Sequence, residues 1–454
     1  MDQLESWLRK TSDFLWGAPL IFIIVGGGLF FVVYSRALPY RYFGHAINIL
    51  RGKYDRDDDP GDITHFQALS AALSGTLGLG NIAGVAFAVS YAGPSALLWM
   101  WITALLGVAT KFFTCTLSIM YRGQDSRGNV QGGPMYVIRE GLGGRWMPLA
   151  VFFCLAGLIG TLPVFQINQL TETMRESVLL PFDVISGDQV ATFNLWFGLA
   201  IAALVGLVIF GGVRRVGYSA ARLVPSMVVL YLFFVVVIIA INIEQVPAAL
   251  ASIFTHAFES DLSAVAAGGL MGVVITGVRQ GAFSNEAGVG TEVMAHGAAR
   301  TDEPVREGLV AMMGPVIDTL VVCTLTALVL ITTGAWKAGT DVAGAALTAR
   351  AFEQSLGPIG PWIIMLLVTV FSMSTMFTFW YYGAKCLGFL IGAERQHWYK
   401  YVYVALIVLG AVISLQAVIF LITIGYALMA IPTMIASLIL APKVMEAARE
   451  YLKP

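Results

Sequence analysis

The stretch Ser74-Gly75-Thr76-Leu77-Gly78-Leu79-Gly80-Asn81-Ile82-Ala83-Gly84 decides how the rest of this chain is interpreted. It lies inside a long apolar run, 66–91, which exceeds the length of about 20 residues that a helix needs to cross a bilayer. A glycine in a helix interior costs about 1 kcal/mol relative to alanine. Because four glycines fall within ten residues here, the sequence predicts that this helix unwinds in the middle of the membrane.

The composition of the whole chain supports a membrane protein. Of its 454 residues, 57% are hydrophobic and 12% charged, and its mean hydropathy is +0.78. Soluble proteins carry about 25% charged residues, so a soluble globular protein is excluded. The 27 Phe, 16 Tyr and 10 Trp exclude a disordered one, and a net charge of −1 provides no basic surface for nucleic acid. We therefore predict an all-α polytopic membrane protein.

Apolar runs between charged or Pro/Gly-rich stretches predict about eleven transmembrane helices. They cover 17–35, 66–91, 94–121, 147–174, 192–211, 217–242, 262–297, 308–333, 359–392, 398–415 and 417–441. Most of the 27 Lys and Arg lie in one alternating set of loops. The exceptions in the opposite set are Arg9, Lys10, Arg175, Lys337 and Arg350, and those inside spans are Lys111 and Arg279. Since basic loops stay inside the cell, we expect a multi-pass protein of the cell (inner or plasma) membrane with a cytoplasmic C-terminus.

A second glycine-rich segment lies five spans after the first. The run 262–297 is too long for one straight crossing and contains Gly268, Gly269, Gly272, Gly277 and Gly281. Interrupted helices at matching positions of two five-helix halves indicate the binding site of a transporter, whereas close helix packing through small residues is the alternative. We predict breaks near 76–80 and 275–281.

The same spacing predicts the organisation of the chain. We expect an N-terminal extra helix with a connector at 1–62, a first five-helix repeat at 63–243, a second, inverted repeat at 260–442, and a cytoplasmic C-terminal tail at 443–454.

Motifs of an enzyme are not found. The cysteines Cys115, Cys154, Cys323 and Cys386 show no repeated spacing, and neither H-E-x-x-H nor G-x-S-x-G occurs. The sequence contains no nucleophile–base pair and no ring of like charges that would line a channel. We therefore expect neither an enzyme nor an organic cofactor, and a channel is the less favoured alternative.

Several motifs, in order along the chain, carry a specific resemblance. They are Gly80-Asn81-Ile82-Ala83-Gly84-Val85-Ala86, Gly132-Gly133-Pro134-Met135-Tyr136, Phe283-Ser284-Asn285-Glu286-Ala287-Gly288 and Tyr381-Tyr382-Gly383. With them the chain resembles the alanine or glycine:cation symporter family. The resemblance implies the five-plus-five inverted-repeat fold of the leucine-transporter type, a small neutral amino acid (alanine or glycine) as substrate, sodium as coupling ion, and uptake by alternating access.

The sequence departs from the usual family pattern in the span 359–392. Thr378-Phe379 stands where Gly-Trp is frequent, and Ala384 replaces a Glu. These positions lie near where a substrate side chain would point.

The broken helices supply candidate substrate contacts. Unwinding frees backbone N–H groups at a positive helix end, which suits a carboxylate. Gln166 matches a glutamine of the family that contacts substrate, and Leu170 lies one turn further on the same face. The full candidate set is Thr76, Gly78, Gly80, Gln166, Leu170, Ile275, Thr276 and Gly277.

The adjacent hydroxyls of Ser374 and Thr375 resemble a sodium site of this fold. Sodium is a hard cation that takes oxygen ligands, and the backbone partners implied are Ser74, Leu77 and Phe371. Thr76 and Asn81 are candidates for another sodium site. The alternatives are hydroxyls bonded to their own helix and, for Asn81, a hydrogen bond between helices.

Ionisable side chains at membrane depth are expensive and are expected to be paired. For Arg279, Glu286 and Asp318 we expect structural or gating ion pairs, and the first two lie seven residues apart, on roughly one helix face. Lys111 is expected to extend toward the cytoplasmic surface. A proton-coupled transporter that uses Glu286 or Asp318 as the carrier is the alternative, although the neutral pair Ser374 and Thr375 argues against it.

Overall fold

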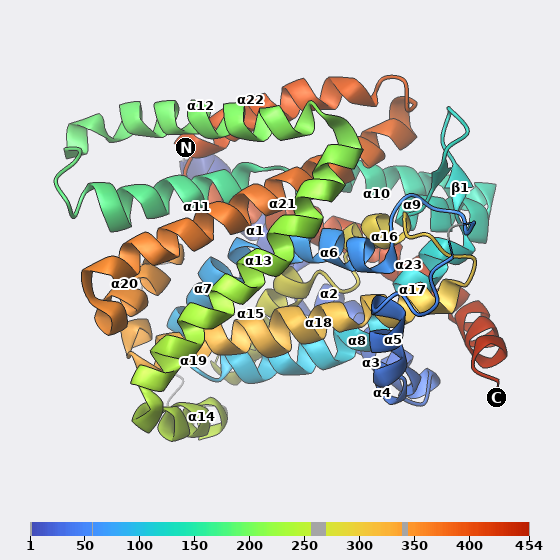
Figure 1. Cartoon of the computed structure of the whole chain (residues 1–454), viewed down its shortest axis with the longest axis horizontal. Helices are drawn as coiled ribbons and strands as arrows, with labels where there is room; N and C mark the ends of the chain where they lie inside the picture. Colours follow the sequence, from blue (N-terminus) through green and yellow to red (C-terminus); the bar gives the residue numbers. More distant parts are fainter. Residues whose placement is uncertain (1, 57, 256–268, 338–343, 454) are drawn as a thin grey trace.

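The structure is a computed structural model and describes residues 2–453 except 57, 256–268 and 338–343. Helices dominate it, and most run roughly parallel to the long axis of the molecule (Figure 1). The helices that correspond to predicted spans are α2 (Ala18–Ile21) and α3 (Gly27–Tyr34), α6 (His65–Thr76) and α7 (Val85–Ala92), α8 (Ala96–Met120), α10 (Met147–Gly160) and α11 (Val164–Met174), α12 (Val190–Ile209), α13 (Gly212–Ile241), α15 (Gly269–Asn285) and α16 (Thr291–His296), α17 (Pro304–Ala311), α18 (Met313–Pro315) and α19 (Thr324–Thr332), α21 (Gly360–Ile391), α22 (Tyr399–Val412) and α23 (Leu415–Tyr451).

The remaining elements are short or lie at the ends of the spans. They are α1 (Asp2–Leu15), α4 (Leu38–Arg41), α5 (Phe43–Leu50), α9 (Pro134–Tyr136), α14 (Val246–Thr255), α20 (Ala345–Leu356) and the antiparallel pair β1 (Gly123–Gln124) and β2 (Val130–Gln131). Residues 262–268 of the seventh predicted span, and 260–268 of the second predicted repeat, lie outside the described residues.

Within the described residues, seven helical segments are long and apolar enough to cross a membrane, or nine if two bent pairs each count as one span. The other two predicted spans contain α15, with 17 residues, and α22, with 14. Both are shorter than the roughly 20 residues of a full crossing. The count of eleven therefore stays a prediction.

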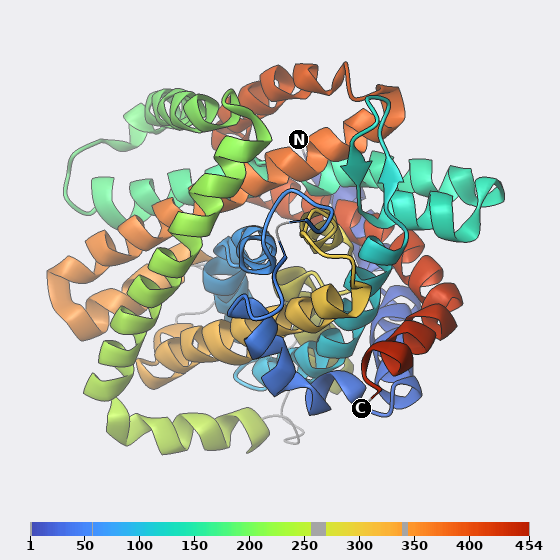
Figure 2. The same ribbon diagram turned by 45° about the vertical axis from the view of Figure 1, so that its right-hand side comes forward.

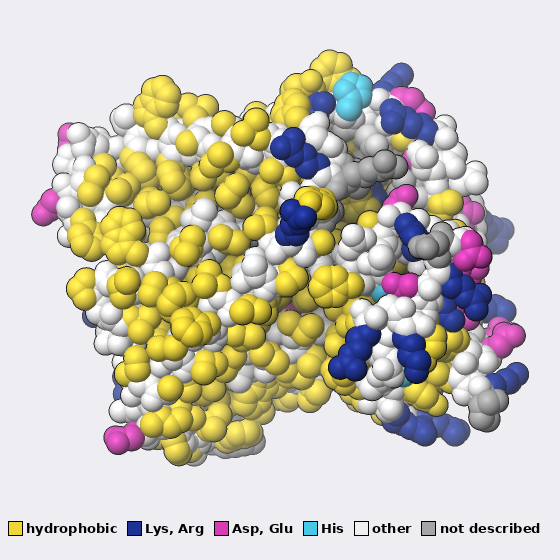
Figure 3. Space-filling model, viewed as in Figure 1, with side chains coloured by type: hydrophobic (Ala, Val, Ile, Leu, Met, Phe, Trp, Pro, Cys, Tyr) yellow, Lys and Arg dark blue, Asp and Glu magenta, His cyan; other side chains and the backbone are white. Residues whose placement is uncertain are grey.

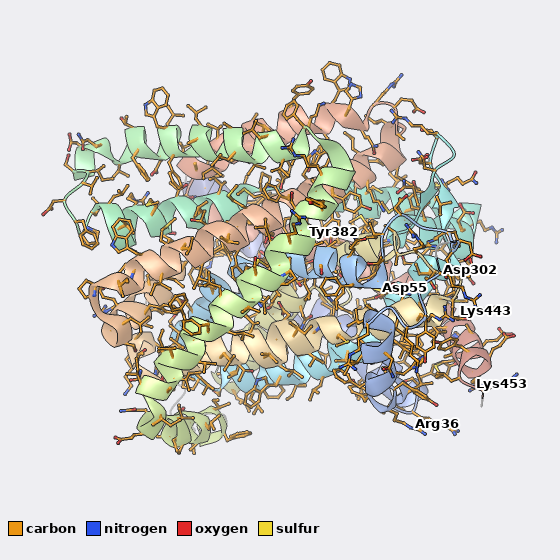
Figure 4. The ribbon with its side chains drawn as sticks, in the orientation of Figure 1. Arg36, Asp55, Asp302, Tyr382, Lys443 and Lys453 are labelled. Carbon is orange, nitrogen blue, oxygen red and sulfur yellow. The ribbon has the colours of Figure 1, made fainter. Side chains whose placement is uncertain are left out.

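The surface separates apolar and charged side chains. In Figure 3 hydrophobic side chains cover most of the left and centre, while Lys and Arg gather on the right, around β1, α9, α17 and the C-terminus of Figure 1. Figure 4 labels Arg36, Asp55, Asp302, Lys443 and Lys453 at this end, which we call the basic end. Large apolar side chains such as Phe22 (77% exposed) and Val229 (68%) face outward, as expected of a lipid-facing surface.

The first broken helix is confirmed. Helix α6 ends at Thr76, and Leu77 leaves the helical region with φ −73° and ψ 82°. A wide helical turn at Gly80–Gly84 leads into α7, and the axis bends by 51° at the break. The two halves of this broken helix, α6 and α7, lie near the centre of the molecule in both ribbon views, and α6 packs against the long diagonal helix α13 (Figures 1 and 2).

The second break lies elsewhere than predicted. Helix α15 runs without interruption through 275–281, so the prediction of a break there is wrong. The chain leaves the helix at Glu286 (φ 55°), Gly288 (84°) and Gly290 (98°) before α16 begins. A Cβ on Gly277 would lie 2.5 Å from Trp99 Cβ of α8, and one on Gly281 would lie 2.9 Å from Thr103 Cβ. These glycines therefore permit close packing of α15 on α8.

The two ends of the chain are helical. The segment 443–454, expected to be a separate tail, continues α23 as far as Tyr451. Helix α1 packs along α23, where Trp16 Nε1 donates to the carbonyl oxygen of Thr423 at 2.8 Å. The boundaries of the two repeats, and their inverted relation, stay predictions.

Candidate functional site

The break in α6 faces the middle of α21. Ser74 Oγ lies 2.7 Å from Ser374 Oγ and donates to the carbonyl oxygen of Ser374 at 2.9 Å. Thr378, one turn further along α21, donates to Ser74 Oγ at 2.7 Å. All three side chains are buried. The structure thus brings two of the predicted sodium ligands together and adds Thr378, which we did not predict as a ligand.

The hydroxyl of Thr375 packs directly on the unwound backbone. A Cβ placed on Gly78 would lie 2.6 Å from Thr375 Oγ1. The same hydroxyl donates to the carbonyl oxygen of Phe371 at 3.1 Å, a bond within its own helix. Leu77, directly before Gly78, is fully buried. The five predicted residues Ser74, Leu77, Phe371, Ser374 and Thr375 therefore come from the two facing segments, and they offer neutral oxygen atoms to a hard cation.

Asn81 forms hydrogen bonds with residues of other helical segments. Its Nδ2 donates to Asp318 Oδ1 at 2.6 Å and to Ser284 Oγ at 3.2 Å, and its Oδ1 accepts from the Gly78 amide at 3.1 Å. Thr76 Oγ1 donates to the carbonyl oxygen of Ala72 at 3.4 Å, within its own helix. Thr76 and Asn81 therefore make the bonds that the alternatives describe, one within a helix and one between helices, and their assignment to a sodium site stays a prediction.

Arg279 and Glu286, two of the charged residues predicted at membrane depth, do not pair with each other, although Arg279 has the ion pair that was expected of it. Arg279 lies 3.6 Å from Asp13 of α1, and it also donates to Ser12 Oγ at 2.8 Å. Glu286 instead accepts a hydrogen bond from Tyr426 at 2.6 Å. The expectation that Arg279 and Glu286 share one face is wrong, because the helix ends at Asn285 and the chain turns away.

Asp318 and Lys111 also differ from expectation. Asp318 accepts bonds from Ser284 Oγ and Thr319 Oγ1, each at 2.7 Å, so neutral donors rather than a cation surround it. Lys111 is only 1% exposed, so it does not reach the surface. Its Nζ points toward α18, where a Cβ on Gly314 would lie 3.1 Å away.

Gln166 of α11 has an unused acceptor. The residue is 5% exposed, and its buried Oε1 has no hydrogen-bond partner in the described structure. A buried acceptor without a donor costs about 1–3 kcal/mol, so a ligand that supplies one would be stabilised there. Leu170, one turn further, is fully buried.

Aromatic rings surround the break in α6. A Cβ on Gly80 would lie 3.6 Å from the ring of Phe283, and one on Gly75 would lie 3.3 Å from the ring of Tyr382. Tyr382, labelled in Figure 4, lies near the middle of the molecule. Phe283 in turn packs edge-to-face on Phe165, next to Gln166, with the ring centres 5.6 Å apart. The space beside the break is therefore narrow.

Ile275, Thr276 and Gly277 are not at the break of their own segment. Thr276 Oγ1 donates to the carbonyl oxygen of Gly272 at 2.7 Å, within α15, and Gly277 packs on α8. The contact with the first broken helix is made further along, where Gln280 Nε2 donates to the carbonyl oxygen of Gly80, just after the break, at 2.9 Å. Sequence reasoning missed Gln280, although a glutamine one turn before the Phe283 motif was a usable signal.

A cavity of about 1020 Å³ connects the basic end with the site. Its lining includes Asp62, Gln67, Arg122, Thr378 and Lys385. Since Thr378 bonds Ser74, the cavity ends beside the break in α6. Burial lowers the pKa of Arg122, while Glu307, Asp62 and Asp302 act in the opposite direction.

Comparisons with known proteins show the family of this chain. A family model described as the sodium:alanine symporter family matches residues 1–454. The sodium/alanine symporter AgcS of Methanococcus maripaludis is 36% identical, covering 98% of this chain and 97% of AgcS. The probable sodium/glutamine symporter GlnT of Bacillus subtilis is 34% identical, covering 99% and 91%.

A solved structure supports the fold. The crystal structure of MhsT in complex with L-phenylalanine superposes with a TM-score of 0.59 at 12% identity, covering 85% of this chain and 98% of MhsT. At this identity the likeness concerns the fold, which is of the leucine-transporter type. The chain belongs to the sodium:alanine symporter family and is therefore a multi-pass membrane protein that carries out amino-acid–cation symport and is not an enzyme.

Proposed function

We propose that this protein couples inward sodium flow to uptake of a small neutral amino acid, alanine or glycine, by alternating access. One observation carries the proposal: on α21 the hydroxyl of Ser374 lies 2.7 Å from that of Ser74, and the hydroxyl of Thr375 lies against the unwound backbone at Gly78. Hydroxyl and carbonyl oxygens at a helix break are the ligands that suit a dehydrated sodium ion.

The amino acid would bind beside the same break. Its carboxylate would accept from backbone amides between Thr76 and Gly80, and its ammonium would donate to the unused Oε1 of Gln166. The rings of Phe283 and Tyr382 lie within 3.6 Å of where glycine side chains would start. They leave room for a methyl group rather than a long side chain.

The basic end would face the cytoplasm. Basic loops are retained on that side, and the cavity would then open toward the cell interior, with the C-terminus on the same side. In this arrangement sodium and substrate would leave the site toward the cytoplasm.

Two alternatives differ in coupling ion and substrate. Proton coupling would use Glu286 or Asp318; the neutral oxygen atoms of Ser374 and Thr375, which suit a hard cation, favour sodium instead. Glutamine is the second alternative, because it is named for the GlnT relative.

Uptake into liposomes that contain the purified protein tests the proposal. Labelled glycine, alanine, glutamine and leucine are offered with an inward sodium gradient at equal pH, with a proton gradient without sodium, and with choline in place of sodium. We expect accumulation of alanine or glycine only with the sodium gradient. Accumulation driven by the proton gradient alone would refute sodium coupling, and preference for glutamine or leucine would refute the substrate assignment.

A further inference from the structure

A cluster of one carboxylate and two imidazoles joins three helices near the basic end. Glu307 of α17 has no exposed surface, and both of its oxygens are bonded. His296, the last residue of α16, reaches Oε1 through Nδ1 at 2.5 Å, and His65, the first residue of α6, reaches Oε2 through Nδ1. The cluster therefore ties the start of one broken helix to the end of the other.

Two polar atoms next to this cluster have no partner. His296 Nε2 and Glu292 Oε1 are buried and unbonded, and both residues have no exposed surface. They lie one turn apart on α16 and are electrostatically coupled. With Nδ1 donating to Glu307, His296 Nε2 is an acceptor, and Glu292 Oε1 is an acceptor when ionised. A proton bound at either atom would turn that atom into a donor, so each is a place where a proton can bind.

Charge balance in the interior also calls for protons. Among the described residues the buried acids are Glu286, Glu292, Glu307, Asp318 and the partly screened Asp59, whereas Lys111 is the buried lysine. Uncompensated buried charges cost several kcal/mol each, and such groups hold protons instead. The titratable or charged groups that face the cluster from neighbouring elements are Lys111 and Cys115 of α8, Tyr382 of α21, Tyr426 of α23, Arg306 of α17, Glu286 before α16, and Arg122 and Asp55 of the connecting loops.

The cluster lies directly behind the cavity wall. Ile63 and Gln67, two residues to either side of His65, line the cavity, as do Ala295 and Gly297, which flank His296. Protons therefore have a short route to the cluster from the basic end.

The surrounding backbone forms a seam between the two broken helices. The Arg300 amide donates to the carbonyl oxygen of Ile63 at 2.6 Å, and the Asp62 amide donates to that of Ala298 at 3.0 Å. The guanidinium of Arg122 donates across the seam to the carbonyl oxygens of Gly297 and Pro60, at 2.9 and 3.0 Å. The start of α6 and the end of α16 are thus built to move as one unit.

We propose that His65, Glu292, His296 and Glu307 form a proton-binding site, filled from the basic end, whose proton holds α6 to α16 and α17 during transport. The proton here is a resident ligand and is not the driving ion. Without it, the carboxylates of Glu292 and Glu307 remain charged and buried in the seam, which loosens the unit. The consequence for transport rests on the proposed function and orientation: uptake should decrease as the internal pH rises.

Sodium-driven uptake at varied internal pH tests this consequence. The external pH and the sodium gradient are held constant while the liposome interior is set between pH 6.5 and 8.5. We expect wild-type uptake to fall at least about threefold across this range, as for one titrating site. His65→Gln and His296→Gln should give a flat profile, because glutamine keeps an N–H donor but does not titrate.

Two histidines outside the cluster serve as matched controls. His397 is exposed and lines the cavity, and His45 of α5 bonds the hydroxyl of Tyr451 in α23. His397→Gln and His45→Gln should keep the wild-type decrease. A flat wild-type profile, or cluster variants that follow the wild type, would overturn the proposal.

Thermal unfolding in detergent provides a readout that does not need transport. Unfolded histidine releases its proton between about pH 6 and 7, and in the proposed site the carboxylate of Glu307, bonded to both imidazoles, would favour the protonated form. The proton therefore stabilises the fold fully at low pH, and this contribution is lost as the pH rises and the folded site releases it. The difference in Tm between wild type and Glu292→Gln or His296→Gln should change between pH 6.5 and 8.5. Parallel curves would refute the site, whereas absence of sodium-driven uptake at every pH would refute only the proposed function.

Discussion

Replacing Gly78 by alanine places a methyl group against the proposed sodium site. The new Cβ would lie 2.6 Å from Thr375 Oγ1, so the two atoms must separate by roughly 0.8 Å to reach ordinary contact at 3.4 Å. Gly78 does not have a positive φ, so alanine brings no backbone strain. Overpacking of this kind typically costs about 1–3 kcal/mol. Because the atom displaced is a proposed ligand, we expect the sodium concentration for half-maximal uptake to rise roughly tenfold to a hundredfold.

The assay is sodium-dependent alanine uptake in liposomes, and the chain offers a matched control. A Cβ on Gly80 would meet the ring of Phe283 at 3.6 Å, an ordinary contact. Gly80→Ala should therefore keep the wild-type sodium dependence. The same overpacking should lower the Tm of Gly78→Ala by an amount that corresponds to no more than about 1–3 kcal/mol, so uptake is compared at equal amounts of folded protein.

A double substitution separates the steric cause from other causes. In Thr375→Ala the hydroxyl is gone, so adding Gly78→Ala should change sodium dependence little further. If Gly78→Ala and Gly80→Ala have the same sodium dependence as wild type, the reasoning that places sodium between α6 and α21 is wrong. If the two effects are additive, the methyl group acts elsewhere than on Thr375.

Three further substitutions test other parts of the site. Ser374→Ala removes one proposed ligand, so the sodium requirement for uptake should rise much more than the apparent affinity for alanine falls at saturating sodium; equal effects on both would contradict the assignment. Gln166→Ala removes the unused acceptor, so alanine should raise the Tm less than in wild type when sodium is present, by an amount that corresponds to about 1–3 kcal/mol of binding free energy. An unchanged rise in Tm would exclude contact between the substrate and Gln166. Arg122→Lys keeps the charge but loses the planar guanidinium group that donates to several backbone carbonyl groups. Tm in detergent should therefore fall by an amount that corresponds to at least about 1 kcal/mol. An unchanged Tm would show that the seam does not depend on this side chain.

The sequence predicted the helical architecture well because the bilayer imposes it. A helix in lipid must be long and apolar over its whole length, so apolar runs alone indicate where helices lie. Irregularities inside a span were harder to predict. The run 147–174 contains Thr161 and Pro163, where α10 ends and α11 begins, yet its composition is apolar throughout. The two-fold relation between the repeats remains a prediction that superposition of the halves would test.

Candidate residues were predicted best where two signals coincided. Ser374 and Thr375 are adjacent hydroxyls in an apolar span opposite a glycine run, and the structure brings them to that run. Lys111 had only one signal, its position near a span end. That position says nothing about residues on other helices. The buried acids Glu292 and Asp318 come from such helices, and their attraction for Lys111 stabilises the lysine in the interior. Partners distant in sequence decide whether a charge reaches the surface.

Glycine runs have two uses in a membrane helix, and composition alone does not separate them. A Cβ on Gly78 would meet the hydroxyl of Thr375 on another helix, and the backbone unwinds there. A Cβ on Gly277 would lie 2.6 Å from the carbonyl oxygen of Ala96 in α8, and the helix continues, because close packing compensates for the poor helix propensity of glycine. The true second break combines Glu286, Gly288 and Gly290 at positive φ, which a helix does not tolerate. A polar residue among spaced glycines, as in Asn285-Glu286-Ala287-Gly288, is therefore a better indicator of an unwound membrane helix than the number of glycines.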